Sequence, residues 1–385
     1  MTGGKVSERL YNKERSLMKM TKLSALAMTT ALCAPAAFAE DMSNELTLVS
    51  WGGAYQASQH KAYVEPYIAA NPGLKVIWDE SSGEAVAKLR AMNETGNVTW
   101  DLVDAVASDA MRLCDEGLAD EIDHDADLAA APDGTSASED FGNLLVSDCF
   151  VPQIVYSTTF GYRTDLVGAE APTTVCDVFD LAKFPGKRAL QKRPIDNLEW
   201  ALYCDGVAKD DIYDVLGTDE GVAQALAKLD TIKESVVWWS AGAETPQLLA
   251  DGEVVMGSTY NGRLFSAIAE QNQPIGMLWD MQSFDLDGWI VPAGLPADRK
   301  ARVMDFLKFA TDTQRLADQA AYISYGPARA SSAPLVGKHA ELGIDMAPHM
   351  PTDPANAGNV HTYDYEWWAD NRDDLDGKFQ AWLVK

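Results

Sequence analysis

The sequence lacks the short motifs that mark most enzyme active sites. It has no Gly-x-Ser-x-Gly elbow, no His-Glu-x-x-His pair and no Gly-Lys-Ser/Thr phosphate loop. Its few histidines are scattered without metal-ligand spacing, at His60, His124, His339, His349 and His361. We therefore predict no catalytic residues, no metal site and no cofactor.

One acidic stretch, Asp123–Asp127, resembles the first positions of a calcium-binding loop. However, Leu128 stands at the position of the loop glycine, and Gly134 stands at the position of the closing glutamate. A solvated acidic loop explains this stretch better than a metal site.

Basic residues are scarce. The chain has 31 Lys and Arg against 58 Asp and Glu, which gives a formal net charge of −27 at pH 7. Such a field repels nucleic acids and anionic membrane surfaces, and it speeds the arrival of cationic ligands at low salt. Acidity that serves solubility alone is the alternative explanation. We expect no nucleic-acid partner.

Long apolar runs are missing beyond the N-terminal region. Lys19–Ala39 contains lysines, an apolar run and a final Ala-Phe-Ala, which is the pattern of a signal peptide removed on export. We predict that residues 1–39 are an N-terminal extension and signal peptide, cleaved after Ala39, with Met18 as a candidate start.

A lipid anchor is the alternative for this leader, because Cys33 lies near its end. Leu32 stands where a small residue normally precedes a lipidated cysteine, so we expect cleavage without lipidation. No later run approaches the roughly 20 apolar residues of a membrane span. We expect a periplasmic protein with no stable membrane insertion.

Cysteines are few, and four remain after the leader: Cys114, Cys149, Cys176 and Cys204. An even number in an oxidising compartment favours two disulfides. Of the three connectivities, Cys114–Cys149 with Cys176–Cys204 keeps each bridge within one half of the chain. Buried free thiols are the alternative.

What the sequence does contain is an alternation of strand and helix patterns. Apolar strand runs such as "LTLVSW", "LKVIW" and "WDLVDAV" alternate with helical segments that end at Pro or Gly. After a polar stretch near residues 130–140 the alternation starts again. The pattern predicts an α/β protein with two lobes built on parallel strands.

Aromatic and acidic residues gather where these strands end. A strand runs into Trp51, two glycines and Tyr55, and others end at Trp239 and at Tyr260. The segment "MQSFDLDGWIVPAG" then adds Asp285, Asp287 and Trp289, with both carboxylates on one face of an extended chain. Because ligands of open α/β sheets lie beyond the carboxyl ends of the strands, these positions are candidate binding residues.

The order and spacing of several segments resemble the extracytoplasmic solute-binding proteins of ABC importers, close to the spermidine/putrescine type. The segments are "LTLVSWGGAY", "WDLVDAVASDAMRLCDEGLADEID", "KFPGKRAL…NLEWALYCDGV", "LLADGEVVMGSTYNG" and "FDLDGWIVPAG". The resemblance implies a two-lobed periplasmic-binding-protein fold of type II, which holds its ligand in the interlobe cleft and closes by hinge bending. It places lobe 1 at residues 40–155 and 288–345, lobe 2 at 156–287 and 346–385, and the crossing strands near 152–160 and 287–292.

The resemblance also implies roles for individual residues. Trp51 and Tyr55 match one aromatic wall of polyamine binders, and Tyr260 matches an aromatic residue of the opposite lobe. Asp287 matches the aspartate that grips an ammonium, and Asp196 falls roughly on a second carboxylate. The turn after Trp51 would then hold an aromatic plate against an amine, with glycines allowing close approach.

The sequence departs from the polyamine pattern at several positions. Asp104 begins a segment that replaces hydroxyl and aromatic residues, and Asp285 replaces an aromatic residue. Lys192 and Arg193 stand near an expected acidic pair, and a basic residue there would suit a ligand that also carries a carboxylate. A zwitterion such as an amino acid, γ-aminobutyrate, an opine or a betaine is therefore the rival of a polyamine.

The partners implied by the resemblance are a small amine ligand and the transmembrane permease subunits with their ATPase. We expect a monomer and not an enzyme. A secreted hydrolase on a similar scaffold is the alternative class, and a sensor that presents its ligand to a membrane receptor would use the same fold.

Overall fold

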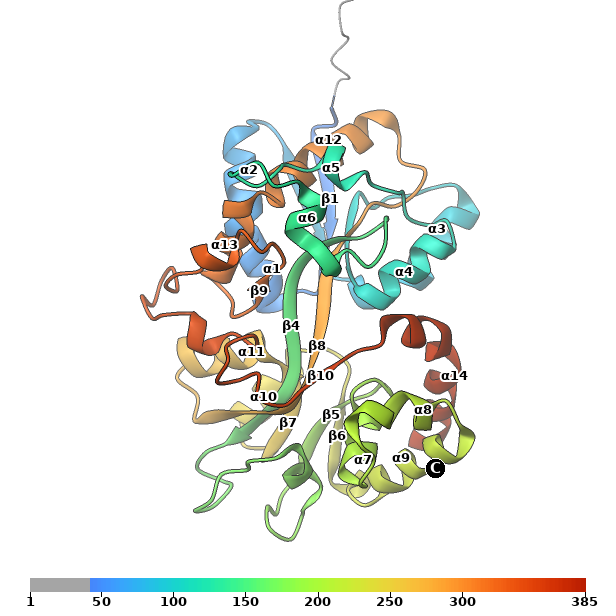
Figure 1. The fold of residues 1–385 in the computed structure, drawn as a ribbon, viewed down its shortest axis with the longest axis vertical. Helices are drawn as coiled ribbons and strands as arrows, with labels where there is room; N and C mark the ends of the chain where they lie inside the picture. Colours follow the sequence, from blue (N-terminus) through green and yellow to red (C-terminus); the bar gives the residue numbers. More distant parts are fainter. Residues whose placement is uncertain (1–41) are drawn as a thin grey trace, which may run out of the picture. The chain divides into compact units, whose positions relative to one another are not determined.

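The computed structural model describes residues 42–385 of the chain (Figure 1). The predicted signal peptide and its cleavage after Ala39 lie outside the described residues. Among the helices within residues 42–385, none combines the length and the apolar character needed to cross a bilayer.

One lobe is built on the short parallel strands β1 (Glu45–Val49), β2 (Lys75–Asp79) and β3 (Leu102–Val106), in the order β2-β1-β3. Helices cover both faces of this sheet, which is why β3 is buried along its whole length. The helices of this lobe are α1 (Gly53–Gln59), α2 (Glu65–Ala70), α3 (Ala85–Thr95), α4 (Ala107–Asp115), α5 (His124–Asp127), α6 (Ala137–Phe141), α12 (Ala297–Ala310) and α13 (Thr313–Ala320).

The other lobe repeats the arrangement with β5 (Arg188–Gln191), β6 (Val236–Trp239) and β7 (Met256–Tyr260), in the order β7-β5-β6. Its helices are α7 (Asn197–Cys204), α8 (Ile212–Leu216), α9 (Asp219–Asp230), α10 (Glu244–Ala250), α11 (Asn261–Phe265) and α14 (Tyr365–Leu383). Each lobe has its own apolar core, one around Trp200 and Trp368 and the other around Tyr63 and Phe306.

Single turns of 3-10 helix link several of these elements. They lie at Ser82–Glu84, Gly142–Leu144, Val175–Phe179, Lys209–Asp211, Lys233–Ser235, Ala333–Leu335 and Ala347–His349. Wider π-helical turns continue α1 at His60–Val64 and α11 at Ser266–Glu270.

Two long strands, β4 (Val151–Arg163) and β8 (Ile275–Ile290), run through both lobes (Figure 1). They pair antiparallel along nearly their whole length, and β3 joins β8 in one lobe while β7 joins β4 in the other. The short strands β9 (Gly326–Pro327) and β10 (Val360–Thr362) pair with β4 and β8. The two-lobed α/β architecture agrees with the sequence, but β8 begins well before the crossing expected at 287–292, and the exact lobe boundaries stay a prediction.

Both sequential disulfides are present, one in each lobe. Cys114 at the end of α4 is bonded to Cys149 just before β4, with their Cα atoms 5.6 Å apart. Cys176 is bonded to Cys204 at the end of α7, with a Cα separation of 5.2 Å. Each bridge therefore fixes a helix end to a distant segment of the same lobe.

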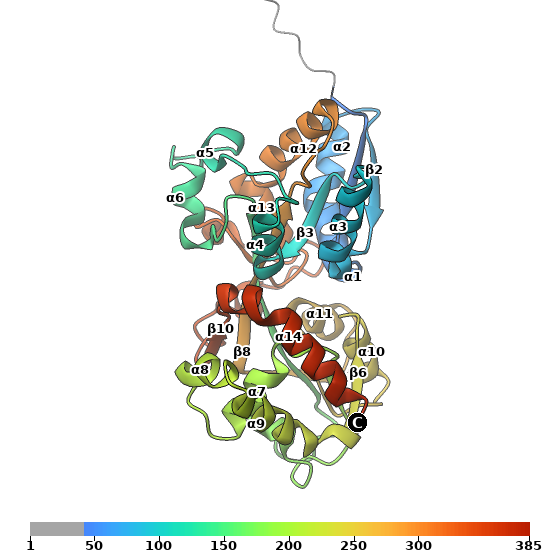
Figure 2. The same cartoon turned by 90° about the vertical axis from the view of Figure 1, so that its right-hand side faces the viewer.

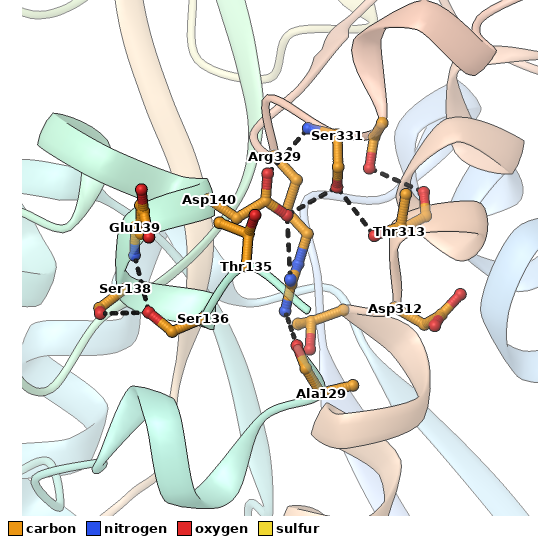
Figure 3. A network of polar contacts seen from close by, with 12 residues as sticks. Ala129, Thr135, Ser136, Ser138, Glu139, Asp140, Asp312, Thr313, Arg329 and Ser331 are labelled. Atoms are coloured by element: carbon orange, nitrogen blue, oxygen red, sulfur yellow. Dashed lines mark hydrogen bonds and ion pairs between the residues drawn. The ribbon is translucent and has the colours of Figure 1, made fainter. Parts of the chain in front are cut away.

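A buried ion pair ties α6 to the segment that follows α13 (Figure 3). Asp140 Oδ2 lies 3.1 Å from Arg329 Nη1, and both side chains are almost completely buried. Ser331 donates to the same carboxylate through its backbone N–H at 2.8 Å and its hydroxyl at 2.6 Å. Arg329 Nη2 also donates to the Ala129 carbonyl at 2.7 Å, so the charges are paired and hydrogen-bonded at once.

Asp140→Ala should therefore destabilise the protein strongly, because it leaves the buried Arg329 guanidinium without its counter-charge. Removing one partner of such a pair typically costs about 3–5 kcal/mol of the free energy of unfolding. Urea denaturation of the purified protein measures this. Glu139→Ala, at the exposed neighbouring carboxylate of α6, is the control and should change little. Equal stability of the two variants would contradict the role of the pair.

Candidate ligand-binding site

A narrow cavity of about 30 Å³ lies where the strands of both lobes end beside the crossing strands. Side chains at or just after the ends of β1, β3, β5 and β7 meet there with side chains of β4 and β8. The lining residues are Trp51, Tyr55, Val106, Ile154, Tyr156, Arg193, Tyr260, Arg263, Asp287 and Tyr325. This is the place where the sequence predicts a ligand.

Aromatic side chains make up half of the lining residues. Tyr325 lies 5.8 Å from Tyr55 and 6.0 Å from Tyr156, measured between ring centroids. Tyr156 in turn lies 5.4 Å from Tyr260, edge to face. With Trp51 these rings make an aromatic box, and aromatic faces attract an organic cation.

Asp287 is the carboxylate of this box. Trp51 Nε1 donates to its Oδ2 and the Tyr55 hydroxyl donates to its Oδ1, both at 2.7 Å. The side chain faces the cavity because the strand register places Asp287 opposite Val106 of β3 and Ile154 of β4. Only 3% of Asp287 is exposed, so any charge on it needs compensation from close by.

Asp104 lies directly behind this layer and does not line the cavity. Gln59 Nε2 donates to both of its oxygens, at 2.8 and 2.9 Å, and Ser50 fixes Gln59 through a 2.7 Å hydrogen bond. Burial raises the pKa of Asp104 to about 7. Burial, together with the charge of Asp104, holds the pKa of Asp287 well above its ordinary value, so this end of the cavity favours a cation.

Two guanidinium groups face the same cavity from the other lobe. Arg193 Nη2 lies 3.2 Å from Asp196 Oδ2, and Arg263 Nη2 donates to the Trp51 carbonyl at 3.1 Å. The Nε groups of both arginines are buried and have no hydrogen-bond partner within residues 42–385. Neither arginine forms an ion pair with Asp287, because no guanidinium nitrogen of Arg193 or Arg263 lies within 4.0 Å of an Asp287 carboxylate oxygen.

The other predicted carboxylates lie beside the cavity. Asp285 is held by the Tyr156 hydroxyl and the Leu286 backbone N–H, both at 2.7 Å, and burial raises its pKa to about 7. It lines a smaller cavity of about 10 Å³ that shares Arg193 with the main one. Asp196 pairs with Arg193 and accepts a hydrogen bond from Tyr363, so it orients Arg193.

Two predicted tryptophans do not reach the cavity. Trp239 is fully buried behind Tyr260, with a ring separation of 6.1 Å. Trp289 packs in the lobe core, with its ring 5.5 Å from Tyr63 and 6.2 Å from Phe306. Trp239 therefore supports the wall from behind through Tyr260, whereas Trp289 belongs to the lobe core.

The glycine turn after Trp51 admits protein side chains. Gly52 and Gly53 have φ angles of +66° and +60°, which favour glycine. A Cβ on Gly53 would lie 2.6 Å from Arg263 Nη1, and one on Gly52 would lie 2.9 Å from Glu80 Oε2. Arg263 and Glu80 therefore approach this turn closely, while the expected close approach of an amine ligand stays a prediction.

Sequence reasoning missed four lining aromatic or basic residues: Tyr156, Arg193, Arg263 and Tyr325. Arg193 drew notice only as a departure from the polyamine pattern. Within residues 42–385, no group of three or more potential metal-ligating side chains comes together. Asp123 instead caps the short helix α5, and Asp125 accepts hydrogen bonds from Ser138.

Comparison with known proteins identifies the family. The model of the bacterial extracellular solute-binding protein family matches residues 62–352. The γ-aminobutyric acid-binding protein of Pseudomonas aeruginosa is 36% identical over 352 residues, covering 91% of this chain and 94% of that protein.

Solved structures agree. The binding protein MotA of A. tumefaciens B6, in complex with glucopine, is 28% identical with a TM-score of 0.77, covering 88% of this chain and 99% of that one. The solved structure of the GABA receptor Atu4243 is 31% identical with a TM-score of 0.73, covering 89% of this chain and 98% of that one. A spermidine/putrescine-binding protein of Streptococcus pneumoniae is only 16% identical and shows the fold alone. This chain therefore belongs to the bacterial extracellular solute-binding proteins and is a solute-binding protein of the ABC-transporter type.

Proposed function

We propose that this protein captures a small zwitterion with a primary amine and a carboxylate, such as γ-aminobutyrate, and delivers it to an ABC permease. The observation that carries the proposal is the separation of charge in the cavity. Asp287 and the two arginines line one space but do not pair with each other. A ligand with one charge of each sign would bridge them.

The ammonium end belongs at Asp287. The carboxylate there is already oriented by Trp51 and Tyr55, and the aromatic box surrounds it. The carboxylate end belongs at Arg193 and Arg263, whose buried Nε groups lack hydrogen-bond partners within residues 42–385. Charge-assisted hydrogen bonds from arginine to a carboxylate are among the stronger polar contacts in proteins.

A polyamine is the weaker candidate. Both of its ends are cationic, and one of them would meet the guanidinium groups of Arg193 and Arg263. The two neighbours named for spermidine and putrescine are 16% and 20% identical, whereas the relatives named for γ-aminobutyrate are 36% and 31% identical. The spermidine/putrescine type read from the sequence is thus less well supported than its zwitterion alternative.

Binding without turnover is the corresponding role, because the relatives named above are binding proteins or receptors. We further propose export by the predicted signal peptide, cleavage after Ala39 and action as a periplasmic monomer with the permease and its ATPase. The two disulfides suit an oxidising compartment. The lobe boundaries given by the sequence remain part of this proposal.

Isothermal titration calorimetry with four ligands tests the need for both charges. We expect binding of γ-aminobutyrate and little binding of butyrate, butylamine or putrescine. Asp287→Asn should weaken the binding of γ-aminobutyrate by roughly 100-fold or more, because it leaves a buried ammonium without its counter-charge. Glu94→Gln, at an exposed carboxylate of α3 outside the cavity, is the control. Tighter binding of putrescine would support the polyamine alternative instead.

Arg193→Gln should weaken the binding of γ-aminobutyrate by roughly 10–100-fold, since a hydrogen bond to a charged group contributes about 1.5–3 kcal/mol. Its preference for γ-aminobutyrate over putrescine should fall at the same time. Lys192→Gln removes the same charge from an exposed neighbour and should change neither value. Melting temperatures of both variants show whether they are folded, and an unchanged preference in folded Arg193→Gln would contradict the assignment.

The affinity should depend on pH through Asp287. Its pKa is raised in the free protein, and an ammonium favours its ionised form, so affinity is lost as pH falls through that pKa. Below it the loss approaches about tenfold per pH unit, while the ligand keeps both charges. Asp104→Asn removes the charge behind Asp287 and should move the loss to lower pH. Calorimetry at pH 6, 7 and 8 measures both profiles, and identical profiles would exclude this coupling.

A further inference from the structure

Two helices from different lobes lie against each other outside the ligand cavity. α4 belongs to the core of one lobe through Ala110 and Leu113. α14 is anchored in the core of the other lobe through Trp368, Leu375 and Phe379. The two helices are in contact, as Figure 2 shows. The contact is therefore one that can differ between open and closed arrangements of the lobes.

Reciprocal ion pairs join these helices. Arg112 of α4 donates to both oxygens of Asp373 of α14, Nη1 to Oδ1 at 2.9 Å and Nη2 to Oδ2 at 2.5 Å. Arg372 of α14 donates through Nη1 to Asp109 Oδ1 of α4 at 2.6 Å. Each helix therefore contributes one arginine and one aspartate. We call these four residues the α4–α14 clasp.

The environment decides how much each pair contributes. Asp109 and Arg372 have side chains that are only 14% and 19% exposed, whereas Asp373 is 74% exposed. Exposed pairs contribute little, so the Asp109–Arg372 pair should dominate. Arg112 is additionally oriented within its own lobe by Glu116 at 3.2 Å, which lowers the entropy lost on pairing.

We propose that the α4–α14 clasp stabilises the closed arrangement of the lobes without touching the ligand, and so sets the affinity of the receptor. None of its residues lines the cavity. The lobes are closed in this structure, since Arg263 of one lobe reaches the Trp51 carbonyl of the other. The proposal rests on the proposed function only in that the protein binds a solute by closing.

The thermodynamic link is a population shift. When only the closed form holds the ligand fully, the apparent dissociation constant rises as the closed fraction of the free protein falls. A bond between lobes that exists only in the closed form raises this fraction. Breaking the clasp should therefore lower the affinity for every ligand by the same factor and leave ligand selectivity unchanged.

The variants for the test are Asp109→Asn, Arg372→Gln, their combination, and the exchanged pair Asp109→Arg with Arg372→Asp. The matched control is Asp219→Asn. It removes a 2.6 Å ion pair with Lys378 that also involves α14 but stays within one lobe. Thermal unfolding of each variant establishes that it is folded.

The first readout is the distance between the lobes in the ligand-free protein. Spin labels on Glu94→Cys of α3 and Glu220→Cys of α9, both exposed positions of different lobes, report this distance. We expect Asp109→Asn and Arg372→Gln to shift the distribution to a more open form. The combination should add little to either single variant, and the exchanged pair should restore the wild-type distribution.

The second readout is the affinity for γ-aminobutyrate by calorimetry. Each single variant should bind roughly 3–10-fold more weakly than wild type, the control should bind as wild type, and high salt should reduce the difference. If the folded single variants keep the wild-type distances and the wild-type affinity, the proposal that the clasp stabilises the closed arrangement is wrong. If neither the wild type nor any variant binds γ-aminobutyrate, the proposed ligand is wrong. The distances in the ligand-free protein still test the role of the clasp.

Discussion

The pairing of β4 with β8 is the constraint on which the rest of the molecule depends. These strands serve both lobes, and their register places Tyr156 opposite Asp285 and Ile154 opposite Asp287. Because side chains alternate between faces, a slip by one residue would turn Asp287 away from Trp51 and Tyr55. The same ladder is the connection about which the lobes can move, so position of the site and freedom of closure come from one element.

Burial of carboxylates beside this ladder makes the site electrostatically demanding. Asp104, Asp285 and Asp287 are each at most 7% exposed, and burial raises the pKa of all three. The charged forms are costly until a cation arrives, and the nearest guanidinium groups are held elsewhere by Asp196 and by the Trp51 carbonyl. An ammonium that enters the aromatic box therefore meets carboxylates that gain from its charge, while neutral ligands offer no such compensation.

Much of the fold could be predicted from the sequence, because strand and helix periods repeat clearly and cysteine spacing limits the bridges. The lining of the candidate cavity was predictable at strand ends, as at Trp51 and Tyr260, and at Asp287, which the family resemblance indicated although it lies within β8. Trp239 and Trp289 follow the same rule but point into cores, because a position at a strand end does not tell which way the side chain points. Tyr156 lies within β4, and Tyr325 and Arg263 reach the cavity through the meeting of distant segments, which no local pattern encodes.

The way charges are paired in the cavity explains why a ligand should be needed for tight closure. Asp287 accepts hydrogen bonds from Trp51 and Tyr55, and Arg193 forms its ion pair with Asp196 of its own lobe. Had Asp287 and Arg193 paired across the cleft, the empty protein would close on itself, and a ligand would have to break a desolvated ion pair before binding. Keeping the opposite charges apart leaves that bridge to the zwitterion that we propose as the ligand. Closure in the absence of ligand then depends on other contacts between the lobes, such as the Arg263–Trp51 hydrogen bond and the ion pairs between α4 and α14.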